Sequence, residues 1–95
     1  LGAATPSMDG ARAPFGRLLR QGRQRAGLSQ LALALQAEVS TRHLSWLENG
    51  RAEPSRAMVL RLAERLAVPL RERNAWLQAA GYAPLYTEHA LADPA

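Results

Sequence analysis

The sequence of 95 residues contains no cysteine, which excludes disulfide bonds, thiolate chemistry and zinc sites of the cysteine type. Aromatic residues make up only 5% of the chain while 47% of it is hydrophobic, which favours helices rich in leucine and alanine over a β-sandwich. No apolar run approaches the roughly 20 residues of a membrane-spanning helix, and no basic segment followed by an apolar core marks a secretion signal. The composition therefore predicts one intracellular domain with a modest core and no membrane partner.

Lysine is also missing, so all 12 basic residues are arginines. Eleven of these arginines lie between residues 15 and 80 together with five glutamates, which gives this part of the chain a net charge of +6. A compact basic domain suits a polyanionic partner. A solvated basic surface explains the same charge equally well, so the charge alone does not decide between them.

Apolar residues recur with helical spacing, at about 100° per residue, in five segments. In the first segment Phe15 and Leu19 share one face. Ser29, Ser40 and Ser55 each precede such a segment, in the position of an N-cap. The connections are short and no hairpin signal appears, so the predicted fold class is all-α, a five-helix globule. The predicted helices span residues 15–26, 29–36, 40–49, 55–67 and 70–80.

The composition changes along the chain and predicts its domain organisation. Residues 1–13 are rich in glycine, alanine, proline and serine, which predicts a disordered arm. Because residue 1 is not methionine, residues 1–7 are interpreted as an addition in front of Met8. The domain itself is predicted to span residues 14–81, and residues 82–95 to form a tail or linker.

The stretch STRHLSWLENG, residues 40–50, predicts a helix with two unlike sides. Leu44 and Leu47 share one side, where they can dock on the domain. The opposite side carries hydroxyl, guanidinium, indole and amide groups, from Thr41, Arg42, Ser45, Trp46 and Asn49. With the preceding helix and its short turn, this segment has the dimensions of a helix-turn-helix. A DNA major groove admits such a helix; an ordinary surface helix is the alternative, but it would usually carry Glu, Lys and Gln.

Arg23 and Glu48 each fall at the border of the apolar face of their helix. A carboxylate removed from water needs a partner. We therefore predict an ion pair between them, which would join the first and third helices and fix the angle at which the third is presented. The alternative is that both side chains are solvated.

The polar groups predict different kinds of contact with DNA. Arg42 is the expected guanine reader, because a guanidinium can bond O6 and N7 together, and phosphate contact is its alternative. Thr41 and Ser45 are expected to read bases less strictly. Gln30 and Ser40 lie at helix starts, which favour phosphate oxygens.

Two further arginines are expected to clamp the DNA backbone, Arg25 at the end of the first helix and Arg51 in the loop after the third. No carboxylate pair, glycine-rich phosphate loop or metal-ligand spacing stands out, so neither an enzyme nor a metal or cofactor is predicted.

A protein-interaction or antitoxin-like module is the alternative function. In the last predicted helix Leu70, Leu77 and Ala80 form an inward stripe, and Trp76 lies off it. Together with Tyr82 this tryptophan could form a dimer patch or a docking surface for a further domain. Equally, Trp76 could cover the corner between the last two helices.

The chain resembles the lambda-repressor-like DNA-binding domains of the Cro/repressor, or xenobiotic-response-element, family. The matching pieces, in the family's order and spacing over residues 15–68, are "LR..R...GLSQ", "LA", "VS...LS.LENG" and "PS...L.RLA..L.V". The resemblance implies a positioning helix at 29–36 and a recognition helix at 40–49. The continuation LQAAGYAPLY, residues 77–86, resembles the subset that is followed by an MmyB-like ligand-sensing domain.

The resemblance also implies roles for individual residues. Thr41, Arg42 and Ser45 occupy positions that read bases in the family. Trp46 occupies a position that contacts bases in some members. Gln30 matches a glutamine that contacts phosphate and braces the recognition helix, Asn49 matches a phosphate-binding asparagine, and Arg23 with Glu48 matches an internal ion pair. The implied partner is double-stranded DNA, bound as a homodimer by a bacterial, cytoplasmic, nucleoid-associated transcription regulator. A small-molecule effector would act only through a C-terminal domain.

Two positions depart from the family pattern. Glu38 stands in the turn where the family usually has glycine, and a left-handed conformation there costs on the order of 1 kcal/mol. Trp46 is large for a side that faces DNA. We expect it to pack partly against the domain and to meet DNA at its edge.

Overall fold

The computed structural model describes residues 8–86, with side chains from Pro14 onward. Within this range it has five helices and no strand, which confirms the all-α prediction. The helices are α1 (Met8–Arg25), α2 (Gln30–Ala37), α3 (Thr41–Glu48), α4 (Arg56–Arg65) and α5 (Leu70–Ala79). None of the helices described is long and apolar enough to cross a membrane.

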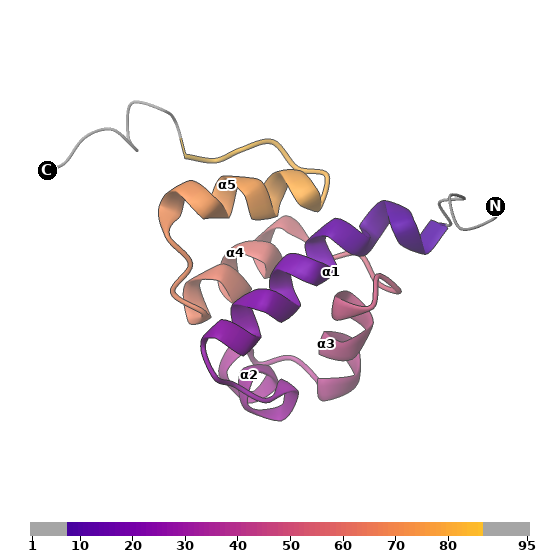
Figure 1. The fold of residues 1–95 in the computed structure, drawn as a ribbon, viewed down its shortest axis with the longest axis vertical. Helices are drawn as coiled ribbons and strands as arrows, with labels where there is room; N and C mark the ends of the chain where they lie inside the picture. Colours follow the sequence, from indigo (N-terminus) through magenta and orange to yellow (C-terminus); the bar gives the residue numbers. More distant parts are fainter. Residues whose placement is uncertain (1–7, 87–95) are drawn as a thin grey trace, which may run out of the picture.

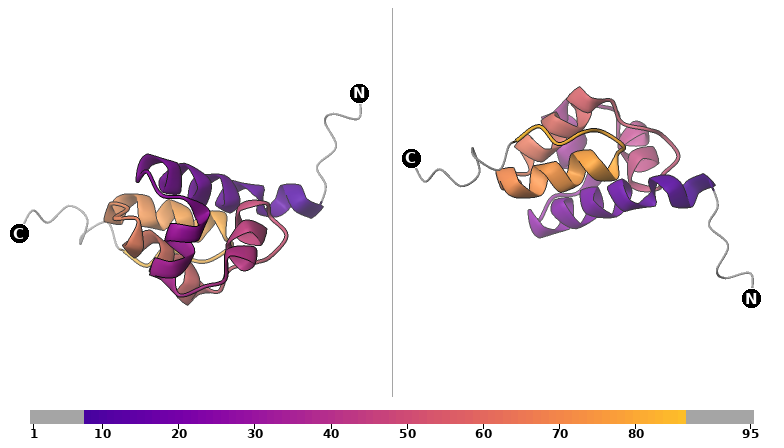
Figure 2. Two further views of the ribbon diagram at one scale, coloured as in Figure 1. Left: turned by 90° about the horizontal axis from the view of Figure 1, so that it is seen from below. Right: turned by 90° about the horizontal axis from the view of Figure 1, so that it is seen from above.

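The long helix α1 holds the two halves of the domain together. Figures 1 and 2 show α1 along one face of the globule, with α4 and α5 on one side of its path and α2 and α3 on the other. It packs on α3 and on α5, while α2 packs on α3 and α4. The position of α3 is therefore set by α1 and α2 together.

The core is built from the apolar stripes that the periodicity predicted. Phe15 and Leu19 of α1 are buried, and Leu44 and Leu47 of α3 are 0% and 1% exposed. Each fully buried leucine contributes roughly 1.5–3 kcal/mol of transfer free energy. The remaining buried apolar side chains are Leu33, Ala34, Ala37, Val59, Leu62, Ala63, Leu66, Val68, Trp76 and Leu77.

Three serines start helices as predicted. The Oγ atoms of Ser29, Ser40 and Ser55 accept hydrogen bonds from the backbone N–H three residues later, at 3.0–3.1 Å. Each bond satisfies one of the amide groups that a helix start leaves without an intrahelical partner. The caps explain why α2, α3 and α4 begin one residue after the predicted positions.

Helix α1 begins at Met8, seven residues before the predicted start at residue 15, and Pro14 lies inside it. Residues 8–13, which the composition placed in a disordered arm, are helical here, and residues 1–7 of that arm lie outside the described part. Proline removes one backbone donor and restricts the preceding turn. The segment before it nevertheless contains alanine, arginine and methionine, which favour helix.

The buried face of α5 differs from the predicted stripe. Trp76 is 3% exposed and meets the Phe15 ring edge-to-face, with centroids 6.0 Å apart and planes at 88°. Leu70, predicted to point inward, is 46% exposed. Leu77 of the predicted stripe is 0% exposed, so the indole widens the buried face and the start of the helix is left in solvent. Trp76 is consequently not available for the docking surface that the sequence suggested.

The chain after α5 is described as far as Tyr86 and is not helical. Asn74 of α5 holds it: the Oδ1 atom accepts from the backbone N–H groups of Leu85 and Tyr86 at 3.1 and 3.0 Å, and Nδ2 donates to the Tyr86 carbonyl at 2.8 Å. The Tyr82 hydroxyl donates to the Pro54 carbonyl at 2.7 Å. Residues 82–86 thus lie against the domain, and the rest of the predicted tail, 87–95, lies outside the described residues.

The turn between α2 and α3 adopts the geometry that glycine prefers although it carries glutamate. Glu38 has φ 57° and ψ 47°, in the left-handed region, and its N–H closes the end of α2. A β-carbon in this region costs roughly 1–2 kcal/mol. The turn therefore keeps the left-handed conformation despite the strain that the β-carbon of Glu38 adds.

Replacing Glu38 with glycine is expected to raise the free energy of unfolding by about 1 kcal/mol, because the strain of the left-handed residue is removed. Thermal unfolding followed by circular dichroism would measure the gain. Gln36→Gly, at an exposed helical position of the same helix, is the matched control and is expected to lose about 1 kcal/mol. A loss of stability in both variants would contradict the account of the turn.

Candidate nucleic-acid interface

Helix α3 has one buried and one exposed side, as its sequence predicted. Leu44 and Leu47 are buried, and α3 packs on α1 and α2. On the other side Thr41, Arg42 and Asn49 are exposed, and Ser45 is half-buried. The exposed groups are hydrogen-bond donors and acceptors on a rigid helix, which suits the recognition of a polar partner.

Trp46 lies on the exposed side and is 42% accessible. The guanidinium carbon of Arg42, one turn earlier, sits 5.9 Å from the centre of its ring. A cation over an indole face is attracted by about 0.5–1 kcal/mol at an exposed site. The tryptophan thus packs against a neighbour on its own helix and holds the guanidinium at the surface.

Glu48, at the end of α3, is the buried charged residue of the described core. Arg23 of α1 donates to both of its oxygens, from Nε to Oε2 at 2.6 Å and from Nη2 to Oε1 at 3.1 Å. This is the ion pair predicted from the border positions of the two residues. Gln30 of α2 adds a hydrogen bond from Nε2 to Oε1 at 3.1 Å, so one carboxylate joins α1, α2 and α3.

Arg20 of α1 also reaches this cluster, with 47% of its side chain exposed. Its Nε donates to Glu48 Oε1 at 3.3 Å and its Nη2 to Asn49 Oδ1 at 2.9 Å. Asn49 in turn lies 3.4 Å from the Ser45 hydroxyl. These contacts extend the cluster from the buried carboxylate to the exposed side of α3.

The residues expected at the phosphate backbone lie in different places. Gln30 and Ser40 stand at the starts of α2 and α3, and Arg51 is exposed in the loop after α3. Arg25 instead faces α5, where its Nη1 lies 3.6 Å from Glu72 Oε1. The end of α1 turns this side chain toward the α4–α5 connection, and its predicted contact with the DNA backbone stays a prediction.

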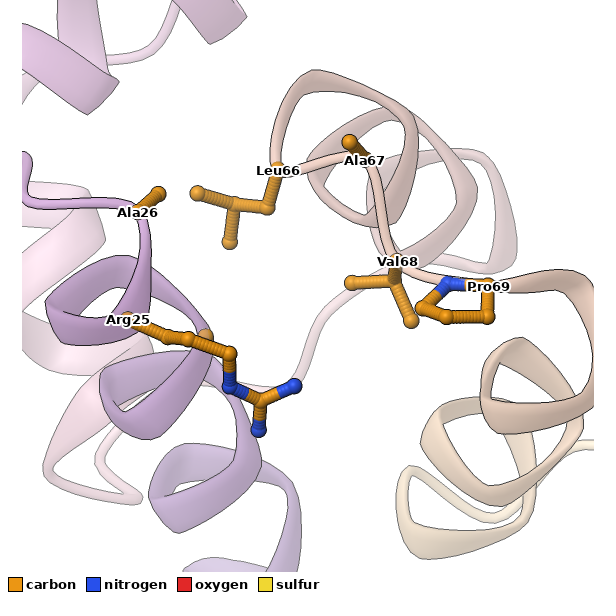
Figure 3. A pocket seen from close by; sticks show the side chains of 7 residues that line it. Arg25, Ala26, Leu66, Ala67, Val68 and Pro69 are labelled. Atoms are coloured by element: carbon orange, nitrogen blue, oxygen red, sulfur yellow. The ribbon is translucent and has the colours of Figure 1, made fainter.

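Figure 3 shows this position of Arg25 at a pocket between α1 and the α4–α5 connection. Leu66, Val68 and Pro69 form its far wall. The pocket does not include any residue of α3. It is therefore separate from the exposed side chains described above.

Comparison with known proteins identifies this arrangement. The sequence matches a family described as a helix-turn-helix domain over residues 14–76, well over half of the chain. The chain is a helix-turn-helix domain. Among solved structures it is similar to the restriction-modification controller protein C.AhdI from Aeromonas hydrophila, with 32% sequence identity, a TM-score of 0.61 and coverage of 65% of this chain and 94% of that one. No curated protein matches the sequence.

The carboxyl group that holds this helix-turn-helix together is stabilised in its ionised form. Burial by itself raises the pKa of Glu48. The hydrogen bonds from its three partners and the positive charge of Arg23 outweigh burial, so the pKa of Glu48 lies below its ordinary value of 4.5. The hydrogen bonds that Arg23 donates to Glu48 raise the pKa of Arg23 in return.

Acid is expected to destabilise the helix-turn-helix domain through Glu48. Since the pKa of this group is lower in the folded than in the unfolded chain, its contribution is present above pH 4.5 and is lost as the pH falls below that value. The melting temperature of the wild type should therefore fall more steeply between about pH 5 and pH 3 than that of Glu48→Gln. Parallel pH profiles for the two proteins would contradict this assignment.

Two arginines that fix the helix-turn-helix were not found from the sequence. Arg61 Nη1 donates to the Ala37 carbonyl at 3.1 Å and Arg65 Nε to the Gln36 carbonyl at 3.0 Å. They satisfy free carbonyl groups at the end of α2, where cations are also favoured by the helix dipole. The contact between α4 and the end of α2 has no local signal in the sequence, although the pairing of Arg65 with the neighbouring Glu64, at 3.0 Å, does follow from it.

Proposed function

We infer that this domain binds double-stranded DNA as a transcription regulator, with α3 in the major groove. The observation that carries the inference is the position of α3: its apolar side is buried, its polar side is exposed, and a buried ion pair fixes it to α1. A major groove admits one helix and presents donors, acceptors and methyl groups to such a side. The likeness to a restriction-modification controller protein supports a regulatory role.

The exposed groups divide into two kinds of contact. We assign base reading to the outward positions of α3, which are Thr41, Arg42, Ser45 and Trp46. We assign phosphate contact to groups at helix starts, after the end of α3 and at the end of α1, which are Gln30, Ser40, Asn49, Arg51 and Arg25. Helix starts favour phosphate through free N–H groups and the dipole, and phosphate contacts set the register in which bases are read.

Fluorescence anisotropy with a labelled duplex of random sequence tests whether the domain binds DNA at all. Binding is expected at low salt and should weaken steeply as salt rises, because phosphate contacts release counterions. No binding at low salt would refute the proposal. It would leave the alternative of an antitoxin-like or other protein-interaction module, a role that the same fold can serve.

Arg42→Ala is expected to relax specificity at one base pair of the half-site, by about 1–3 kcal/mol. The guanidinium of the exposed Arg42 lies 5.9 Å from the centre of the Trp46 ring, and on this side of α3 it can bond two acceptors of guanine. Affinities for a bound site and its three single-base variants at each position would measure the effect. A uniform loss of affinity for all sequences would show instead that Arg42 contacts phosphate.

We further propose that the regulator acts as a homodimer on a two-fold operator, in the cytoplasm, at the bacterial nucleoid. Dimers of this class bind half-sites about one helical turn apart. The resemblance of residues 77–86 to the MmyB-like subset supports a following ligand-sensing domain, through which a small-molecule effector would act. Analytical ultracentrifugation of the domain with and without an operator duplex would test the stoichiometry of two.

A further inference from the structure

Arg20 adds a positive charge to the buried cluster beyond the one from Arg23 that neutralises the Glu48 carboxylate. Glu48 already receives two hydrogen bonds from Arg23 and one from Gln30. The contact from Arg20 is the longest of the four, at 3.3 Å, and its side chain is 47% exposed against 14% for Arg23. Two guanidinium groups around one carboxylate leave a net charge of +1, and the exposed guanidinium carries it to the surface.

The hydrogen bond to Asn49 decides which way that amide points. Because Arg20 Nη2 donates to Asn49 Oδ1 at 2.9 Å, the acceptor of the amide is occupied. The Nδ2 group is left as a donor, and its contact with the Ser45 hydroxyl is long, at 3.4 Å. An exposed pair of side chains beside α3 therefore offers only donors and one positive charge.

We propose that Arg20 and Asn49 together hold one phosphate of the DNA backbone, with Arg20 as both a phosphate contact and the positioning residue for the Asn49 amide. This rests on the proposed function. Phosphate oxygens accept hydrogen bonds and carry negative charge, which matches a guanidinium beside an amide N–H. The contact at the edge of α3 would set the register of the helix in the groove without reading a base.

The salt dependence of DNA binding separates this role from a structural one. Arg20→Gln keeps an amide donor but removes the charge, and Glu48 retains Arg23 and Gln30, so the variant should stay folded by circular dichroism. The slope of log K against log salt is expected to fall by about 0.9 for each domain bound. Arg20→Lys should restore that slope, because it keeps the charge.

Arg71→Gln is the matched control, since it removes one exposed arginine from α5, which packs on α1 and α4. Its slope should equal that of the wild type. An Arg20→Gln slope equal to that of this control would overturn the inference, and so would a loss of affinity with an unchanged slope. In either case the wild type still binds DNA; a wild type that binds no duplex at low salt overturns the proposed function and this inference together.

Discussion

Replacing Glu48 with alanine is expected to lower the free energy of unfolding by about 3–5 kcal/mol, the usual result of removing one partner of a buried ion pair. The variant leaves the guanidinium of Arg23, which is 14% exposed, without its counter-charge. Gln30 also loses its acceptor, and α1, α2 and α3 lose the carboxylate that joins them. For a domain of this size the loss corresponds to a fall in melting temperature of at least about 12 °C.

Thermal unfolding of Glu48→Ala beside Glu64→Ala tests this expectation. Glu64 is the matched control: it is 65% exposed and pairs with Arg65 at 3.0 Å on the surface of α4. An exposed pair contributes about 0–1 kcal/mol, so its removal should change little. Equal melting temperatures for the two variants would show that the buried pair does not hold the domain together.

Replacing Gly16 with alanine is expected to cost about 1–3 kcal/mol, although alanine is favoured over glycine in a helix by about 1 kcal/mol. A β-carbon at position 16 would meet the carbonyl oxygen of Glu48 and lie 2.9 Å from the carbonyl oxygen of Leu47. Both obstacles are backbone atoms at the end of α3, which cannot turn aside. The added methyl group must therefore move α3 away from α1.

Gly22→Ala is the informative comparison for Gly16→Ala. Its β-carbon would lie 2.9 Å from the Trp76 ring, on the α5 side of α1. Both variants should be less stable by thermal unfolding. Only Gly16→Ala should weaken DNA binding under conditions in which both are folded, because only it displaces α3. Equal DNA affinities for the two folded variants would contradict a role of Gly16 in placing α3.

The features that could be predicted from the sequence are those that follow from helical periodicity and from the need of a buried charge for a partner of opposite sign. The two sides of α3 follow from the spacing of Leu44 and Leu47, and three serine caps mark helix starts. The pairing of Arg23 with Glu48 followed from their border positions, since a carboxylate at the edge of an apolar face needs a nearby cation. The DNA-contact roles of the exposed residues remain predictions.

The features that could not be predicted from the sequence depend on how the helices pack across one another. Trp76 could be placed in the core only once Gly22 and Phe15 of α1 were known to face it. Arg20 and Arg25 lie on the same helix, yet one reaches α3 and the other faces α5. The partner of a side chain as long as arginine depends on which neighbouring helix lies within its reach, and helical periodicity does not give the distance between helices.

Selection of bound duplexes from a random pool tests most directly whether the exposed side of α3 reads DNA sequence. The wild type is expected to enrich a two-fold pattern with half-sites about one helical turn apart. A folded variant with Thr41, Arg42 and Ser45 all replaced by alanine should lose the base preferences while keeping salt-dependent binding. No enriched pattern for the wild type, or the same pattern from the triple variant, would contradict the account.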